Sequence, residues 1–127
     1  MPIKFTFRGR IVTYGAGAWN NRGYNECQQE IREMVAASPD RDQLMQWFVS
    51  KTKLSLNLRF YLGGNRCDRN DLDNLLSPFF NPIVWGAYGG RPKGPIIADA
   101  LFWRIYLTKI RDKDERVEME IEPILDT

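Results

Sequence analysis

The sequence predicts a single α+β domain in which helices pack on one face of a mixed β-sheet. Two patterns of hydrophobic spacing support this prediction. Residues 54–62, LSLNLRFYL, alternate apolar and polar side chains without a break, which is typical of a strand with one buried face. Residues 24–37 instead place apolar side chains at helical spacing. A chain of 127 residues with 43% hydrophobic content is the size of one domain with its own core.

Three further elements are expected before residue 54. Residues 3–13 alternate apolar and polar side chains and predict a first strand. Residues 14–23 are rich in glycine and asparagine and predict a loop. After the helix, Ser38 or Asp40 is expected to cap a second, shorter helix over residues 43–49.

The second half of the chain predicts one helix, a long connection and a hairpin. A short apolar helix is expected to begin at residue 70 or 71. Residues 81–98 contain three prolines and four glycines, which predict an ordered irregular connection long enough to serve a site or an interface. The alternating segments 101–108 and 117–122 then predict two closing strands, joined by a charged turn as a β-hairpin.

The chain contains no histidine. This absence excludes Ser-His-Asp and Cys-His catalysis and zinc sites with histidine ligands, so catalysis would rely on carboxylates, lysines or hydroxyls. Cys27 and Cys67 form no metal motif and are too few for a disulfide framework, which favours a reducing cytoplasm. No apolar stretch approaches the roughly 20 residues of a membrane span, and the N-terminus lacks a signal-peptide core. We therefore expect a cytoplasmic protein with no membrane partner.

Charge is distributed unevenly along the chain. Residues 111–126 hold seven acids against three bases, which leaves the preceding 110 residues with a net positive charge. Two windows, 1–25 and 43–67, each contain four bases and no acid. Such windows suit a polyanionic partner, but an ordinary solvated surface gives the same pattern. Charge alone leaves both interpretations open.

A cluster of carboxylates follows the most regular strand. Asp68, Asp71 and Asp73 lie within six residues, where a loop on a rigid scaffold often carries function. Mg²⁺ typically binds one or two carboxylates together with waters and phosphate oxygens. Asp99, just before the strand 101–108, is the candidate for a third ligand. Alternatively, Asp71 and Asp73 only cap the following helix and complement its dipole.

Residues 71–75, DLDNL, resemble the RusA family of Holliday junction resolvases. The resemblance continues some twenty residues later with an apolar pair, Ala98-Asp99 and an alternating strand that ends in Lys109. It covers roughly residues 54–122. It implies a RusA-like fold over one domain, 1–127, and a homodimeric, Mg²⁺-dependent endodeoxyribonuclease, with Mn²⁺ as a substitute. Such an enzyme resolves four-way DNA junctions by paired nicks in recombination and repair.

Carried over by position, the resemblance implies a catalytic and metal-binding triad of Asp71, Asp73 and Asp99. Two positions depart from the family pattern. Ser77 stands where the family usually has a lysine, and Ala98 stands where it has the first residue of an Asp-Asp pair. These departures favour an alternative function, a catalytically weak or inactive RusA-like protein that binds branched DNA. A metabolic or interaction domain whose acids are helix caps is a third, remoter hypothesis.

Several bases are candidate DNA contacts, because each base that neutralises a phosphate adds salt-dependent affinity. Ordinary solvation is the alternative for the same side chains. The candidates are Arg66, Arg69, Arg91, Lys93 and Lys109.

Aromatic side chains offer a second type of candidate. Trp85 and Tyr88 are expected to stack on unpaired bases, to pack a dimer interface or to pack in the core. The strand 101–108 is apolar on both faces, so it is either central in the sheet or part of an interface. A dimer contact on that strand is the preferred hypothesis.

Overall fold

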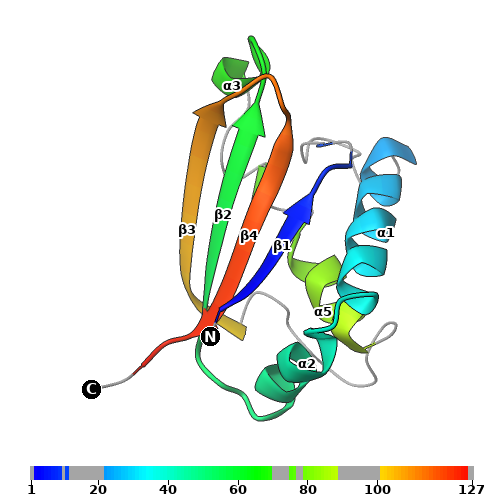
Figure 1. The fold of residues 1–127 in the computed structure, drawn as a ribbon, viewed down its shortest axis with the longest axis vertical. Helices are drawn as coiled ribbons and strands as arrows, with labels where there is room; N and C mark the ends of the chain where they lie inside the picture. Colours follow the sequence, from blue (N-terminus) through cyan, green and yellow to red (C-terminus); the bar gives the residue numbers. More distant parts are fainter. Residues whose placement is uncertain are drawn as a thin grey trace.

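The computed structural model describes residues 2–9, 11, 22–69, 75–76, 79–88 and 101–125. It confirms an α+β domain: α1, α2 and α5 lie to one side of a four-stranded mixed sheet, and α3 sits at the end where β2 and β3 finish (Figure 1). None of the described helices is long and apolar enough to cross a membrane. The elements are β1 Ile3–Phe7, α1 Arg22–Ala36, α2 Arg41–Val49, β2 Leu54–Leu62, α3 Arg66–Arg69, α5 Phe80–Tyr88, β3 Phe102–Arg111 and β4 Arg116–Pro123.

The strand order is β1-β4-β2-β3, which makes the predicted hairpin wrong. β3 pairs in parallel with β2, and β4 pairs antiparallel with both β2 and β1. The connection from β3 to β4 therefore passes over the end of β2. Two hydrogen bonds hold it there, from the Asp112 N–H to the Leu62 carbonyl (3.1 Å) and from the Gly63 N–H to the Glu115 carboxylate (2.8 Å). β2 has the most complete apolar face, and a central position pairs both of its edges.

The core lies between the sheet and the helices. The apolar residues of β2 are all fully buried, and α1 contributes Ile31 and Val35 to the same core. Phe79 makes edge-to-face ring contacts with Phe7 of β1 (6.0 Å between centroids) and Phe60 of β2 (5.7 Å). These contacts attach the segment before α5 to the sheet, because aromatic pairs in this geometry stabilise beyond the area they bury.

The prediction of an irregular connection over residues 81–98 is wrong for its first part. Residues 80–88 form α5, and residues 89–98 lie outside the described residues. Pro82 is the third residue of α5, where a missing N–H removes no hydrogen bond within the helix. Trp85 and Tyr88 are partly buried against the core, which fits the core-packing alternative.

Three smaller differences concern the ends of elements. The first strand ends at Phe7 rather than continuing to residue 13. Asp40 occupies the N-cap position of α2 without a capping hydrogen bond from its side chain, and Ser38 accepts the Asp40 N–H through its hydroxyl (3.1 Å). The short helix α3 was not predicted, because a single turn has too few residues to show helical periodicity.

The end of α2 holds a non-glycine residue in a left-handed backbone conformation. Lys51 has φ 56°, in the position after a helix where glycine is preferred. We expect Lys51→Gly to raise the free energy of unfolding by roughly 0.5 kcal/mol, because relief of strain exceeds the entropy that glycine adds to the unfolded chain. Urea denaturation measures the change. Gly64→Ala, at φ +55°, should have the opposite sign, and a destabilised Lys51→Gly would contradict the prediction.

Candidate functional site

The predicted metal ligands Asp71, Asp73 and Asp99 lie outside the described residues, as do the predicted DNA contacts Arg91 and Lys93. Within the described part of the chain, no group of three or more cysteine, aspartate or glutamate side chains is gathered to hold a metal ion. The structure does describe the segments that flank the predicted site. α3 ends two residues before the first aspartate, and β3 begins three residues after the last.

Glu115 and Arg66 hold the beginning of α3 against the rest of the fold. The Arg66 guanidinium donates one hydrogen bond to the Ile11 carbonyl (2.6 Å) and another to the Glu115 carboxylate. The second oxygen of that carboxylate accepts the Gly63 N–H at the end of β2. Arg66 was predicted as a DNA contact, and the structure gives its side chain a structural role at this end of the sheet.

β3 supplies two cations to the same turn. The Lys109 ammonium donates a hydrogen bond to the Cys67 carbonyl (2.8 Å), and Arg111 contacts both oxygens of the Asp68 carboxylate (2.7 and 2.8 Å). The Arg111–Asp68 pair is well exposed, so its net contribution to stability is small. Lys109 is half-buried, which limits the positions its ammonium can take. The backbone directly before residue 70 is therefore held by the end of β3.

No local sequence pattern marks Glu115 and Arg111 as residues of the candidate site. Both side chains contact α3 only because the strand order brings the end of β2, the end of β3 and the turn after β3 together. A predicted hairpin of β3 and β4 gives no reason for either side chain to meet α3. A prediction that paired β2 in parallel with β3 would have pointed to these residues, because this pairing puts Leu62 beside Arg111.

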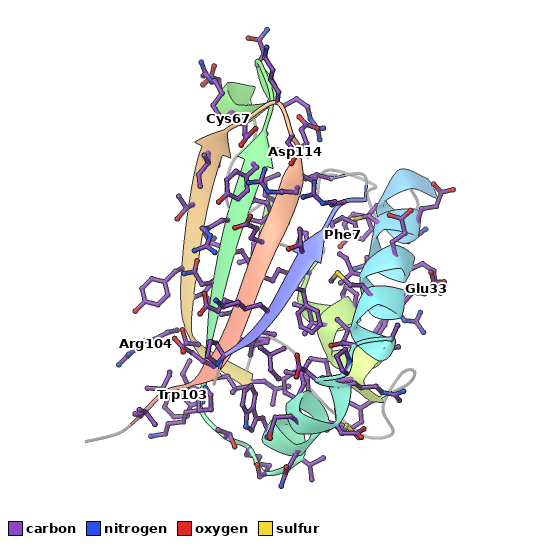
Figure 2. All side chains as sticks on the ribbon, viewed as in Figure 1. Phe7, Glu33, Cys67, Trp103, Arg104 and Asp114 are labelled. Atoms are coloured by element: carbon purple, nitrogen blue, oxygen red, sulfur yellow. The ribbon has the colours of Figure 1, made fainter. Side chains whose placement is uncertain are left out.

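The two flanks of the predicted triad lie at opposite ends of the parallel pair formed by β2 and β3. The register places Leu54 beside Phe102 at one end and Leu62 beside Arg111 at the other. Figure 2 shows Cys67 and Trp103 at these two ends of the sheet. A strand of nine residues spans roughly 26 Å, so α3 and the beginning of β3 are about that far apart within one chain.

A network of charges lies on the sheet face away from the helices. The Glu118 carboxylate accepts hydrogen bonds from Arg116 (3.0 Å), the Tyr61 hydroxyl (3.2 Å) and Arg59 (3.3 Å). The Arg116 guanidinium also lies over the Tyr61 ring, 3.8 Å from its centroid. These contacts join β2 to β4 across the outer face and lie away from the helix-covered core.

The network predicts a loss of stability in acid. The hydrogen bond from Arg116 is the largest cause that lowers the pKa of Glu118 below its ordinary value of 4.5. A carboxylate with a lowered pKa in the folded state contributes stability above its unfolded pKa, and this contribution is lost as pH falls through the folded pKa. We expect the free energy of unfolding to decrease as the pH drops below about 4.5. In the Glu118→Gln variant this decrease with pH should be less steep. Glu122→Gln on the same strand is the control, and denaturation at several pH values measures the slopes.

A scan against protein-family models and a search of the curated proteins find no match for this chain. The RusA resemblance therefore stays a prediction, and it rests on residues 71–75, Asp99 and Lys109. The described structure adds one relation between these motifs. Lys109, the last of these residues along the chain, contacts the turn that leads into residues 71–75.

Proposed function

We propose that the protein is a Mg²⁺-dependent, structure-selective DNA endonuclease that resolves four-way junctions by paired nicks in recombination and repair. The observation that carries the proposal is the position of the DLDNL motif directly after a turn that Arg66 and Lys109 hold at the end of β2. A rigid scaffold that ends in a charged loop is a common place for catalytic groups. The proposed location is the cytoplasm.

In this proposal Asp71, Asp73 and Asp99 hold the cation, since hard carboxylate oxygens are the ligands that Mg²⁺ prefers. A bound cation would supply a nucleophile from water and polarise the phosphate, chemistry that needs no histidine. Lys109 brings a half-buried ammonium to the turn before these residues. It is our candidate for the charge that the family lysine supplies where this chain has Ser77, because a fixed cation stabilises developing negative charge.

Paired nicks require two sites, so the proposed active form is a homodimer. The separation of the two flanks gives a second reason for this assignment. In two copies that run antiparallel, the beginning of β3 in one chain comes near the end of β3 in the other. The proposed triad would then be completed by Asp99 of one chain and by Asp71 and Asp73 of its partner.

Nicking of a labelled four-way junction tests the proposed function. With Mg²⁺ or Mn²⁺ we expect symmetric nicks at the branch point, and with EDTA no nicks. A linear duplex of the same arm sequence is the control for structure selectivity. Absence of nicking with every divalent cation tested would rule out the enzyme.

The second candidate is a RusA-like protein that binds branched DNA without cleaving it. Ser77 and Ala98 favour it, because both replace a charged residue of the family pattern. It predicts a junction mobility shift that is the same with EDTA and with Mg²⁺. An interaction or metabolic domain predicts negligible junction affinity even at low salt, where phosphate contacts are strongest.

A further inference from the structure

The chain between α5 and β3 begins and ends at the same place in the fold. α5 ends at Tyr88 and β3 begins at Phe102, and both rings contact one side chain of α2, Phe48. The Tyr88 ring stacks on Phe48 at 6.5 Å between centroids, with 4° between the ring planes. The Phe102 ring meets Phe48 edge to face at 6.2 Å. The two ends of residues 89–101 are therefore joined through one buried ring.

α2 also holds the end of α5 through a hydrogen bond. The Arg41 Nε–H donates to the Ala87 carbonyl (2.9 Å). This carbonyl is one of the last four of α5, which have no partner within the helix, and a cation at this end also complements the helix dipole. Gly89 and Gly90 follow in the sequence, so the next two residues offer no side chain to cap the helix. Arg41 therefore stabilises the last turn of α5.

Both contacts come from one face of α2, the helix that lies next to α5 (Figure 1). Arg41 and Phe48 are seven residues apart, which is two helical turns, so their side chains lie on the same side of the helix. Leu44 lies between them on this side and is fully buried. Asp42 and Gln46 are exposed. The sequence of α2 thus builds one face that contacts both ends of residues 89–101.

Residues 89–101 carry three side chains of the proposed function, Arg91, Lys93 and Asp99. Asp99 comes three residues before Phe102, and three residues of extended chain span at most about 11 Å. The position of Phe102 therefore limits where the Asp99 carboxylate can reach. Joining the two ends also lowers the entropy cost of ordering the segment, because the folded helices have already closed the loop.

We propose that Arg41 and Phe48 are positioning residues for the proposed metal site, because they hold both ends of the segment that carries Asp99. The inference rests on the proposed function for the role of Asp99, and it adds α2 to the parts of the fold on which activity depends. A misplacement of about 1 Å in a catalytic group can cost about a hundredfold in rate. Phosphate contacts by Arg91 and Lys93 are less sensitive, since the attraction between charges falls slowly with distance. Loosened ends therefore affect catalysis more than binding.

Hydrogen exchange tests the anchoring without DNA or metal. Phe48 is part of the core, so the test uses Arg41, which is only partly buried. In Arg41→Gln the amides of residues 86–88 are expected to exchange about fivefold faster, because a hydrogen bond that holds this turn is lost. Arg32→Gln is the matched control, since it removes an arginine of α1 that lies over the Trp85 ring of the same helix, 5.8 Å from its centroid. Equal exchange of residues 86–88 in the two variants would overturn the anchoring.

Junction nicking tests the positioning itself. Arg41→Gln is expected to lower kcat about tenfold and to raise the Mg²⁺ concentration for half-maximal nicking by a similar factor, with KM for the junction and the circular dichroism spectrum unchanged. Arg41→Lys keeps a donor and a charge and is expected to restore both values, and Arg32→Gln should leave them unchanged.

Two results would count against the positioning role in different ways. If Arg41→Gln exchanges faster but nicks at the normal rate and with the normal Mg²⁺ dependence, the anchoring exists and the positioning role is overturned. If the unchanged protein does not nick at all, the proposed function fails, and the role of Arg41 in nicking fails with it. Hydrogen exchange then decides the anchoring alone.

Discussion

Replacing Asp71 by asparagine should reduce Mg²⁺-dependent nicking of a four-way junction by at least about a hundredfold, since even residues behind the metal ligands change activity 10- to 100-fold. Asparagine keeps the size of the side chain and removes its charge. The effect should therefore appear in the nicking rate and in Mg²⁺ dependence, with little change in junction affinity measured with EDTA. Asp73→Asn and Asp99→Asn should behave in the same way. Nicking that survives Asp71→Asn and Asp73→Asn together would contradict the site.

The exposed Asp68→Asn is the matched control, because it lies in the same acidic segment and is paired with Arg111. Its nicking rate should stay close to that of the unchanged protein. A mixture of Asp71→Asn and Asp99→Asn chains provides a second check on the site. If the two chains of a dimer complete each site, mixed dimers keep one intact site each, and about a quarter of all sites recover. No recovery after the chains have exchanged would contradict sites shared between two chains.

Replacing Gly86 by alanine should destabilise the fold by about 2 kcal/mol. A Cβ atom at this position would lie 2.7 Å from the Arg32 carbonyl oxygen and 2.7 Å from the Val35 Cβ, both rigid parts of α1. α1 and α5 would have to move apart along their contact. Alanine gains about 1 kcal/mol of helix propensity over glycine, which offsets part of this cost.

Gly63→Ala is the matched control, since the nearest heavy atoms to its added Cβ are 3.4 Å away, at ordinary contact distance. Urea denaturation of both variants measures the difference in the free energy of unfolding. An unchanged or more stable Gly86→Ala protein would show that the two helices can separate without cost. Loss of stability in both variants alike would show that the effect is general to glycine replacement.

The elements of this fold follow from local patterns where those patterns are long. β2 was predicted at its observed bounds, because nine residues of alternation leave one choice of face. α1 was predicted within two residues at each end, since its apolar side chains recur at helical spacing. α5 was missed because prolines and glycines were interpreted as breaks. Pro82 is tolerated in the first turn, and Gly86 is where α1 comes closest.

The candidate site, like the fold, could be predicted only in part from the sequence. The acids and bases of the proposed site were visible as a dense polar segment after β2. The partners of α3 were not visible, because Glu115 and Lys109 are more than 40 residues away along the chain. Their contacts depend on a parallel pairing of β2 with β3 that no local pattern specifies. The apolar middle of β3 was identified from sequence as either central or at an interface, and the strand order places it at the edge.

Of the helices and strands, local sequence patterns predict α1, α2, β1, β2 and the segments that form β3 and β4, but not α3 or α5. They also predict the buried faces of α1 and β2 and exclude histidine chemistry. These properties depend on residue type and on spacing over a few neighbours. The tertiary structure alone decided that β2 separates β3 from β4, that Glu115, Lys109 and Arg111 meet α3, and that β3 keeps a free apolar edge. Strand order is a choice between long-range pairings of similar hydrogen-bonding energy, so packing of the whole chain selects it.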